Sequence, residues 1–359
     1  MLAIIGAVCA AVVAALYLWI SGGKPTYSVD GNKRVVTTLA STPYFFCMAI
    51  MKSMFHKKHK DVKLTGISFS QSNMTIDPER VKKYRKNCGF VDGDEVPMTY
   101  PYLMIFPLQG LLLVDKAFCF PAMGIVHLAN RIQQFGVLTA DGAKYTAVSR
   151  LDENLLPHAK GYCFVVVSEV YSGSGGAGST LLWRCESTYL YRAKVTAAVV
   201  GDATPVYESK IKNEYMESCQ EVKPYKLPAG FGLKYAAISG DFNPIHCYAL
   251  TAKLFGFPHG AIMHGMWSNG ACVADIMPPL ADLKSTGKEA MAEVYVELKM
   301  PMYLPANAVL ESKTDDVTPP NLTSPVPLTH KNKRLFQIMM KGKKGGDMVP
   351  HLRGTCSWK

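Results

Sequence analysis

The chain has 359 residues, a formal net charge of +11 and 48% hydrophobic residues. This length favours two domains, and the hydrophobic content suits a packed core, which excludes a largely disordered chain. No nucleic-acid-binding motif is present, so the positive charge favours an anionic membrane surface or a polyanionic ligand. Ten cysteines without a Cys-x-x-Cys pair disfavour zinc ribbons and a disulfide framework.

Residues 1–20 form one apolar run without a charged side chain. The run is long enough to cross a bilayer as a helix, and it lacks the basic start of a cleaved signal peptide. We therefore expect a transmembrane anchor at 1–21, followed by a basic juxtamembrane segment at 22–63. The first cations, Lys24, Lys33 and Arg34, follow the run, which predicts that the remainder of the chain faces the cytoplasm. The glycosylation sequons at Asn73 and Asn321 matter only for a lumenal protein.

From residue 64 onward an internal repeat is visible. The first copy reads Pro78, Tyr84 and then Cys88-Gly89-Phe90; the second reads Pro228, Tyr235 and then Ser239-Gly240-Asp241. A second match aligns Phe120-Pro121 and 125–128 with Phe257-Pro258 and 262–265. Apolar residues at helical spacing follow in both copies, so we expect buried helices at 125–135 and 262–277.

Strand-like segments follow each expected helix. Residues 162–171 and 179–191 flank the glycine-rich turn 172–178 as the arms of a hairpin. In the second half the expected strands are 294–300, 308–313 and 334–341. The pattern predicts two modules, each a helix wrapped by an antiparallel sheet, at 64–195 and 225–359. Residues 196–224 would form the linker, and the Pro- and Thr-rich residues 315–333 a surface loop.

The stretch from Tyr235 to His246 carries the chemistry. A helix is expected to end at Ser239-Gly240, and a new helix to begin with Asn243 as N-cap and Pro244 as its first residue. His246 then lies about three residues inside the new helix, and Asp241 lies in the turn before it. An acid and an imidazole facing one space suit general acid/base catalysis.

Gly265 lies near the start of the next apolar helix, where its uncovered N–H could stabilise a developing negative charge. In the first copy, Phe90, Glu95 and Leu128 stand in the places of Asp241, His246 and Gly265. The first module therefore lacks the acid, the imidazole and the uncovered N–H, and it is expected to shape the pocket. His264 recurs as His127, which favours a structural role for it, and no third ligand at recognisable spacing indicates a metal site.

These residues resemble the signature of MaoC-like dehydratases, the (R)-specific enoyl-CoA hydratases of the hot-dog fold. The resemblance rests on Tyr235, Ser239-Gly240-Asp241, Asn243-Pro244-Ile245-His246, Ala252, Gly256-Phe257 and His264-Gly265-Met266. It implies an α+β double hot-dog behind the expected transmembrane helix.

The resemblance also implies reversible hydration of trans-2-enoyl thioesters to (R)-3-hydroxyacyl thioesters, without a cofactor or metal. Asp241 and His246 would be catalytic and Gly265 N–H would polarise the thioester carbonyl, with Asn243, Tyr235 and Ser239 in supporting roles. Acyl-CoA is the expected partner, an acyl-carrier thioester is the alternative, and a homodimer stays open. Competing interpretations are a silent acyl-binding scaffold and a hot-dog thioesterase, although thioesterases of that fold lack the Asp-x-Asn-Pro-x-His core.

Overall fold

The computed structural model describes residues 22–55, 63–175, 178–193, 207–283, 290–314, 332–342 and 347–359. The expected membrane anchor at 1–21 and most of the expected loop at 315–333 lie outside these ranges. Among the helices within them, none is both long enough and apolar enough to cross a membrane.

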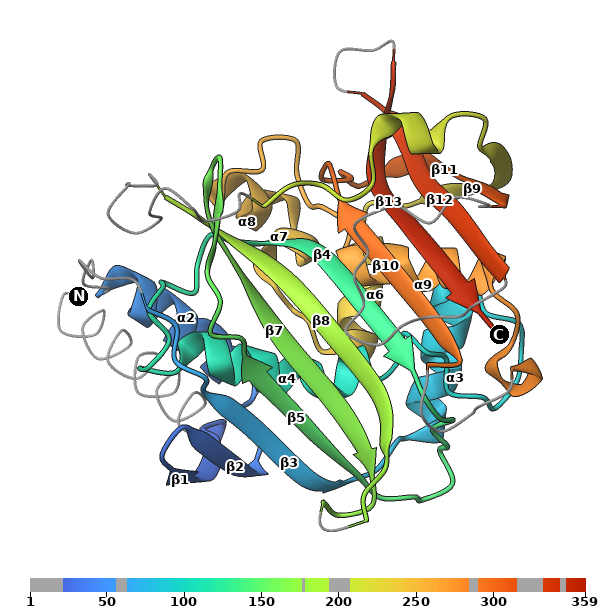
Figure 1. Ribbon diagram of the computed structural model, residues 1–359. Coiled ribbons are helices and arrows are strands. Elements are labelled where there is room, and N and C mark those ends of the chain that lie inside the picture. Colours follow the sequence, from blue (N-terminus) through green and yellow to red (C-terminus); the bar gives the residue numbers. More distant parts are fainter. Residues whose placement is uncertain are drawn as a thin grey trace, which may run out of the picture.

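The architecture is α+β, with one large sheet and a layer of helices (Figure 1). Hydrogen bonds join the described strands in the order β1-β2-β3-β5-β7-β8-β4-β10-β13-β12-β11-β9, and β6 pairs with β7. The strands are β1 (Thr26–Asp30), β2 (Lys33–Thr38), β3 (Ser68–Met74), β4 (Ile125–Gln134), β5 (Tyr145–Leu151), β6 (Leu156–His158), β7 (Gly161–Ser172), β8 (Leu181–Arg192), β9 (Gln220–Leu227), β10 (Ala292–Leu298), β11 (Ala306–Thr314), β12 (Asn332–Lys341) and β13 (Met348–Trp358).

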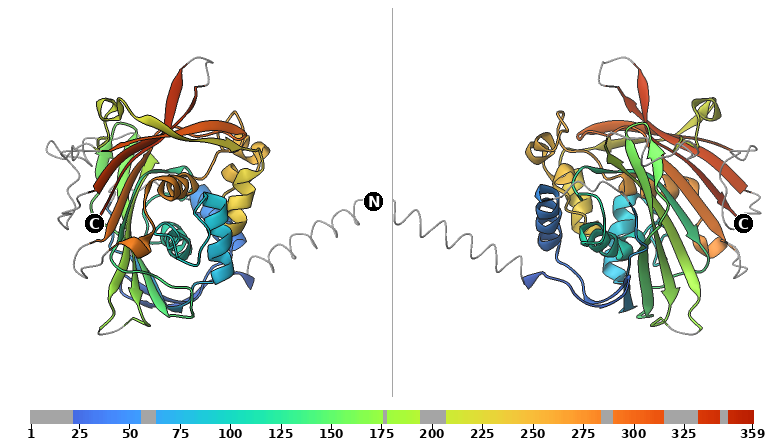
Figure 2. Two further views of the ribbon diagram at one scale, coloured as in Figure 1. Left: turned by 90° about the vertical axis from the view of Figure 1, so that its right-hand side faces the viewer. Right: turned by 60° about the vertical axis from the view of Figure 1, so that its left-hand side comes forward.

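The helices are α2 (Thr42–Met54), α3 (Pro78–Cys88), α4 (Tyr102–Val114), α6 (Phe231–Ser239), α7 (Pro244–Cys247), α8 (Ala249–Leu254) and α9 (Gly265–Ile276), with 3-10 turns η1 (Asn213–Met216) and η2 (Leu280–Asp282). Figure 2 shows α9 and α4 nearly end-on inside the curve of the sheet, with α3 and α6 beside them. A helix enclosed by a curved antiparallel sheet, repeated twice, is the double hot-dog arrangement.

The two halves of the sheet mirror each other about the β4–β10 pair. From this seam outward the first half runs β4, β8, β7, β5, β3, and the second runs β10, β13, β12, β11, β9. The order along the chain matches as well, because β3-α3-α4-β4 in the first half corresponds to β9-α6-α9-β10 in the second. The first match of the sequence repeat is therefore a repeat of structure, with α3 matching α6, and the order of elements also makes α4 match α9.

Several predicted elements are confirmed. The hairpin arms are β7 and β8, and the three strands expected in the second half are β10, β11 and β12. The helix expected near 262–277 is α9. Both α3 and α6 end at a left-handed glycine, Gly89 at φ 88° and Gly240 at φ 82°, as the repeat indicates.

The helix predicted at 125–135 is wrong, because these residues form strand β4. This strand lies in the middle of the sheet between β8 and β10, and its last six residues are all buried. A strand buried on both faces loses the alternating pattern of apolar and polar residues, so its apolar spacing can imitate a helix. Leu128 and His127 therefore do not occupy the places of Gly265 and His264, because both lie in β4; Tyr102, the first residue of α4, occupies the place of Gly265.

A buried ion pair crosses the seam between the halves. Arg131 of β4 and Glu293 of β10 approach to 3.1 Å, with side chains only 6% and 7% exposed. The side chain of Gln133 donates a further hydrogen bond of 2.8 Å to Glu293. This cluster links side chains of the two modules across the β4–β10 ladder.

Candidate active site

The turn between α6 and α7 has the expected local structure. Gly240 adopts the left-handed conformation at the C-terminus of α6, which glycine accepts without strain. Asn243 caps α7, because its side-chain oxygen accepts a hydrogen bond of 3.3 Å from Ile245 N–H. Pro244 is the first residue of α7, where no N–H is needed.

Neighbouring groups of this turn form hydrogen bonds with both the side chain and the backbone N–H of Asp241. Its Oδ1 accepts a hydrogen bond of 3.1 Å from Asn243 N–H, and its own N–H donates to Ser239 Oγ at 3.2 Å. Oδ2 lies 3.9 Å from His264 Nε2, and 23% of the Asp241 side chain is accessible. One carboxylate oxygen is thus fixed by the turn, and water can reach the side chain.

His246 has a defined tautomer. Its Nδ1 lies 2.8 Å from the carbonyl oxygen of Ile262. A carbonyl oxygen only accepts hydrogen bonds, so Nδ1 carries the hydrogen and the neutral ring has its lone pair on Nε2. Nε2 is therefore the nitrogen that can take a proton.

His264 joins the two predicted catalytic residues. Its ring stacks on His246, with centroids 3.9 Å apart and planes inclined by 28°. Its Nε2 donates a hydrogen bond of 2.9 Å to the backbone carbonyl of Asp241. The edge of the predicted supporting residue Tyr235 contacts this imidazole, with ring centroids 5.0 Å apart. The structure thus brings Asp241, His246, Asn243, Ser239 and Tyr235 together.

Burial shifts the pKa values of the three titratable groups. Desolvation raises the pKa of Asp241, although the nearby His246 and the Asn243 N–H oppose the rise. Desolvation lowers the pKa of His246 against the opposing effects of Asp241 and the Ile262 carbonyl. The pKa of His264 falls well below its ordinary value through burial and the neighbouring His246. These pKa shifts favour uncharged imidazoles on His246 and His264 and oppose ionisation of the Asp241 carboxyl.

The same three residues offer ligand atoms within 4.8 Å of one another, a separation that a metal ion could bridge. His264 Nε2 donates to Asp241 O, however, so only its Nδ1 keeps a lone pair that could bind a metal. The hydrogen bonds described above fit an acid/base group.

Gly265, the next predicted residue, begins α9 directly after His264. Its N–H has no hydrogen-bond acceptor among the residues that the structure describes. A Cβ at this position would come within 2.6 Å of Leu298 Cδ1, so glycine leaves the backbone uncovered where the sheet packs closely. The first N–H of a helix is a favourable site for a developing negative charge.

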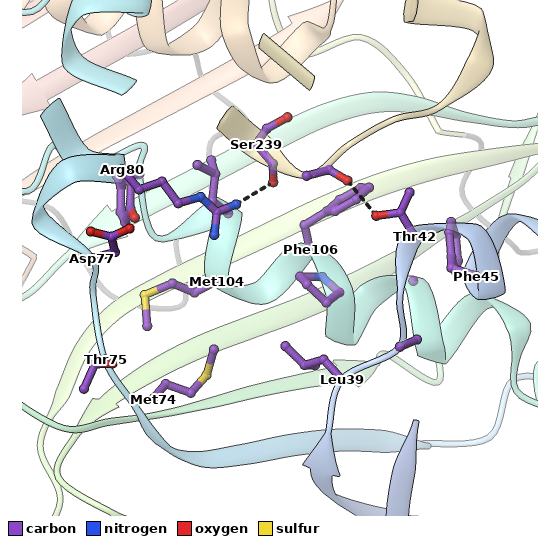
Figure 3. Close-up of a pocket in the computed structure, with 16 residues that line it drawn as sticks. Leu39, Thr42, Phe45, Met74, Thr75, Asp77, Arg80, Met104, Phe106 and Ser239 are labelled. Carbon is purple, nitrogen blue, oxygen red and sulfur yellow. Dashed lines mark hydrogen bonds between the residues drawn. The ribbon is translucent and has the colours of Figure 1, made fainter. Parts of the chain in front are cut away.

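Two further features of the site come from the first half of the chain. A hollow of about 200 Å³ borders Ser239 and Gly240 and is walled largely by apolar side chains (Figure 3). Among the residues lining it are Leu39, Phe45, Met74, Leu103, Met104, Phe106 and Arg80. Glu95 is the residue of the first copy that the repeat aligns with His246. Its side chain instead accepts a hydrogen bond of 2.7 Å from Leu280 N–H. The described part of the first module and the segment before it therefore contribute walls to the site, and Glu95 is not a counterpart of His246.

Comparison with known proteins gives consistent matches. The model of the MaoC like domain family matches residues 213–287. The chain is 31% identical over 248 residues to 3-hydroxyacyl-thioester dehydratase X of Mycobacterium tuberculosis, covering 69% of this chain and 80% of that protein.

Solved structures show the same fold. The crystal structure of HtdX of Mycobacterium tuberculosis has a TM-score of 0.57 at 25% identity, covering 80% of this chain and 98% of that chain. A MaoC-like dehydratase from Phytophthora capsici has a TM-score of 0.58 at 14% identity, covering 82% of this chain and 96% of that one.

Proposed function

Because the chain belongs to the MaoC-like dehydratase family and is a hydro-lyase, we propose that it reversibly hydrates trans-2-enoyl thioesters to (R)-3-hydroxyacyl thioesters. The observation that carries the proposal is the convergence of Asp241 and His246 on His264, the residue directly before the first N–H of α9. The relative from Mycobacterium tuberculosis, named as a 3-hydroxyacyl-thioester dehydratase, supports the same class of substrate.

In the hydration direction, the oxygen of water bonds to the β carbon and one water proton passes to the Asp241–His246 pair. The electrons of the double bond shift toward the thioester, so negative charge develops on the carbonyl oxygen. The N–H of Gly265 stabilises this charge, and a proton from the pair then reaches the α carbon. We treat Asp241 and His246 as one coupled pair, with His246 Nε2 as the available lone pair.

The acyl tail is proposed to extend along the first module into the hollow beside Ser239 and Gly240. Its apolar walls suit a hydrocarbon chain, because burying apolar surface stabilises a complex by about 25 cal/mol per Å². Coenzyme A is the proposed carrier, and the net charge of +11 supports a polyanionic ligand.

The experiment that tests this function is hydration of crotonyl-CoA by the purified protein, followed by loss of the enoyl absorbance and chiral analysis of the product. We expect the (R)-3-hydroxy product. Release of free thiol would instead support a thioesterase, and binding of acyl-CoA without turnover would support a silent scaffold.

We also propose that residues 1–20 tether the protein to a membrane, with the enzyme on the cytoplasmic side. The uncharged apolar run and the cations that follow it support this location. The sequon residue Asn73 is exposed and would acquire a glycan if this side faced the lumen. We expect the protein to resist carbonate extraction from membranes without a glycan at Asn73; a glycosylated protein, or one released by carbonate, would contradict the proposal.

A further inference from the structure

Four successive carbonyl groups at the end of α6 are each bound by a side chain. Arg80 donates from Nε to Ile238 O at 2.7 Å and from Nη2 to Ser239 O at 2.9 Å, the second of which Figure 3 marks. Thr42 Oγ1 donates to Gly240 O at 3.4 Å, and His264 Nε2 binds Asp241 O at 2.9 Å. Arg80 and Thr42 lie about 160 and 200 residues before the turn that they hold, outside the second module.

The carbonyls of Ile238 and Ser239 need partners because the last four carbonyls of a helix have no intrahelical donor. Gly240 O also accepts a hydrogen bond of 3.1 Å from Phe242 N–H. A guanidinium is well suited to the Ile238 and Ser239 carbonyls, since its N–H groups are planar and its charge favours the negative end of a helix. In α6 the helix ends only two residues before Asp241. Movement of this helix end would therefore move the carboxylate.

We propose that Arg80 of the first module and Thr42 of the segment before it are positioning residues, which hold the Asp241 turn in its catalytic geometry. This inference gives the first module a role beyond lining the hollow. The activity measurements that test it rest on the proposed function. Misplacing a catalytic group by about 1 Å can reduce a rate on the order of 100-fold. Neither side chain needs to touch substrate for this effect.

Helix α3 supplies a matched control. Arg85, one and a half turns after Arg80, likewise binds carbonyl oxygens, with Nε at 3.1 Å from Val91 O and Nη1 at 2.7 Å from Glu95 O. These partners belong to the first module's own loop and not to the turn that carries Asp241. Replacing Arg85 removes a similar set of hydrogen bonds without loosening that turn.

The test compares Arg80→Ala, Arg80→Lys and Arg85→Ala with the parental full chain, using crotonyl-CoA because its short acyl group does not need the hollow. We expect Arg80→Ala to lower kcat on the order of 10- to 100-fold with little change in KM, and Arg80→Lys to be intermediate. Arg85→Ala should keep the parental kcat. Since Arg80 borders the open hollow, added methylguanidinium should enter the vacated space and restore part of the kcat of Arg80→Ala.

Hydrogen–deuterium exchange provides a readout independent of activity. Faster exchange across residues 239–246 is expected in Arg80→Ala and not in Arg85→Ala. Parental kcat in Arg80→Ala, an equal loss in Arg85→Ala, or a loss that methylguanidinium does not relieve would overturn the inference. If the parental protein itself failed to hydrate crotonyl-CoA, the proposed function would fail, whereas the exchange comparison would still test the positioning role. Should Arg80→Ala not fold, Arg80→Lys and Thr42→Val carry the same comparison.

Discussion

The imidazole of His264 stacks on that of His246 with 3.9 Å between ring centroids, while its Nε2 holds the backbone of Asp241. One buried neutral side chain therefore links the two groups proposed to exchange protons with the substrate. Burial lowers the pKa of His264 well below its ordinary value, and repulsion from His246 at this distance lowers it further. His264 therefore stays uncharged, and the proton is exchanged by Asp241 and His246.

The acid limb of the pH profile should reflect this pair. Burial raises the pKa of Asp241 and lowers that of His246, so the two groups should titrate as one coupled pair, closer together than a free carboxyl and a free imidazole. The active form has an ionised carboxylate and a neutral imidazole. We expect kcat/KM for crotonyl-CoA to be level above pH 6.5 and to decline as the pH falls below it. Circular dichroism over the same range checks that the fold persists; a limb centred above 6.5 would contradict the burial effect.

The role of the Gly265 N–H can be isolated with two variants. Gly265→Ala and Gly265→Pro both introduce a Cβ against Leu298, but only proline removes the N–H. Proline suits the first position of a helix, and the preceding His264 already has the extended conformation that a following proline requires. We therefore expect Gly265→Pro to be slower than Gly265→Ala by about 10²–10³ in kcat, the usual effect of one such donor. Equal rates in the two folded variants would exclude this N–H from the mechanism.

Chain-length preference should depend on the hollow beside the catalytic turn. Met74 lines it and is only half-buried, so Met74→Trp can fill the space without a large change in the core. We expect this variant to lose more kcat/KM with dodecenoyl-CoA than with crotonyl-CoA. Met48→Trp is the control, because Met48 borders a different hollow. Equal effects of Met74→Trp on the two substrates would place the tail elsewhere.

The ion pair across the seam should be required for stability. Arg131→Met leaves the Glu293 carboxylate buried without its main partner, which typically costs about 3–5 kcal/mol. The exposed pair of Lys82 and Glu79 serves as the control, since Lys82→Met should change the free energy of unfolding by about 1 kcal/mol or less. Urea denaturation measures both. A loss in Arg131→Met no larger than that of the control would show that the seam tolerates the unpaired carboxylate.

The local features of the site could be predicted because they depend on neighbouring residues. The conformation of the turn between α6 and α7 follows from residues close in sequence: a left-handed glycine ends one helix, and an Asn-Pro pair starts the next within about one helical turn. The acid lies between them. This is why Gly240, Asn243, Asp241 and His246 lie as the sequence indicates.

The longer-range features could not be read in the same way. Helix α4 contains Pro107 and Gly110, and most of its residues are buried, so the sequence shows helix breakers there and no amphipathic pattern. Strand β4 is buried on both faces and imitated a helix. Arg80 donates to carbonyl groups more than 150 residues away, a contact that no local spacing encodes.

The central claim is that Asp241 and His246 act as one acid/base pair, and hydration of crotonyl-CoA by Asp241→Asn and His246→Ala tests it most directly. Each substitution should reduce kcat/KM by about 10²–10⁴ while the folded state and its urea midpoint remain near parental values. Because the two groups act as a unit, the double variant should be little slower than either single one. Parental turnover by either folded single variant would contradict the account.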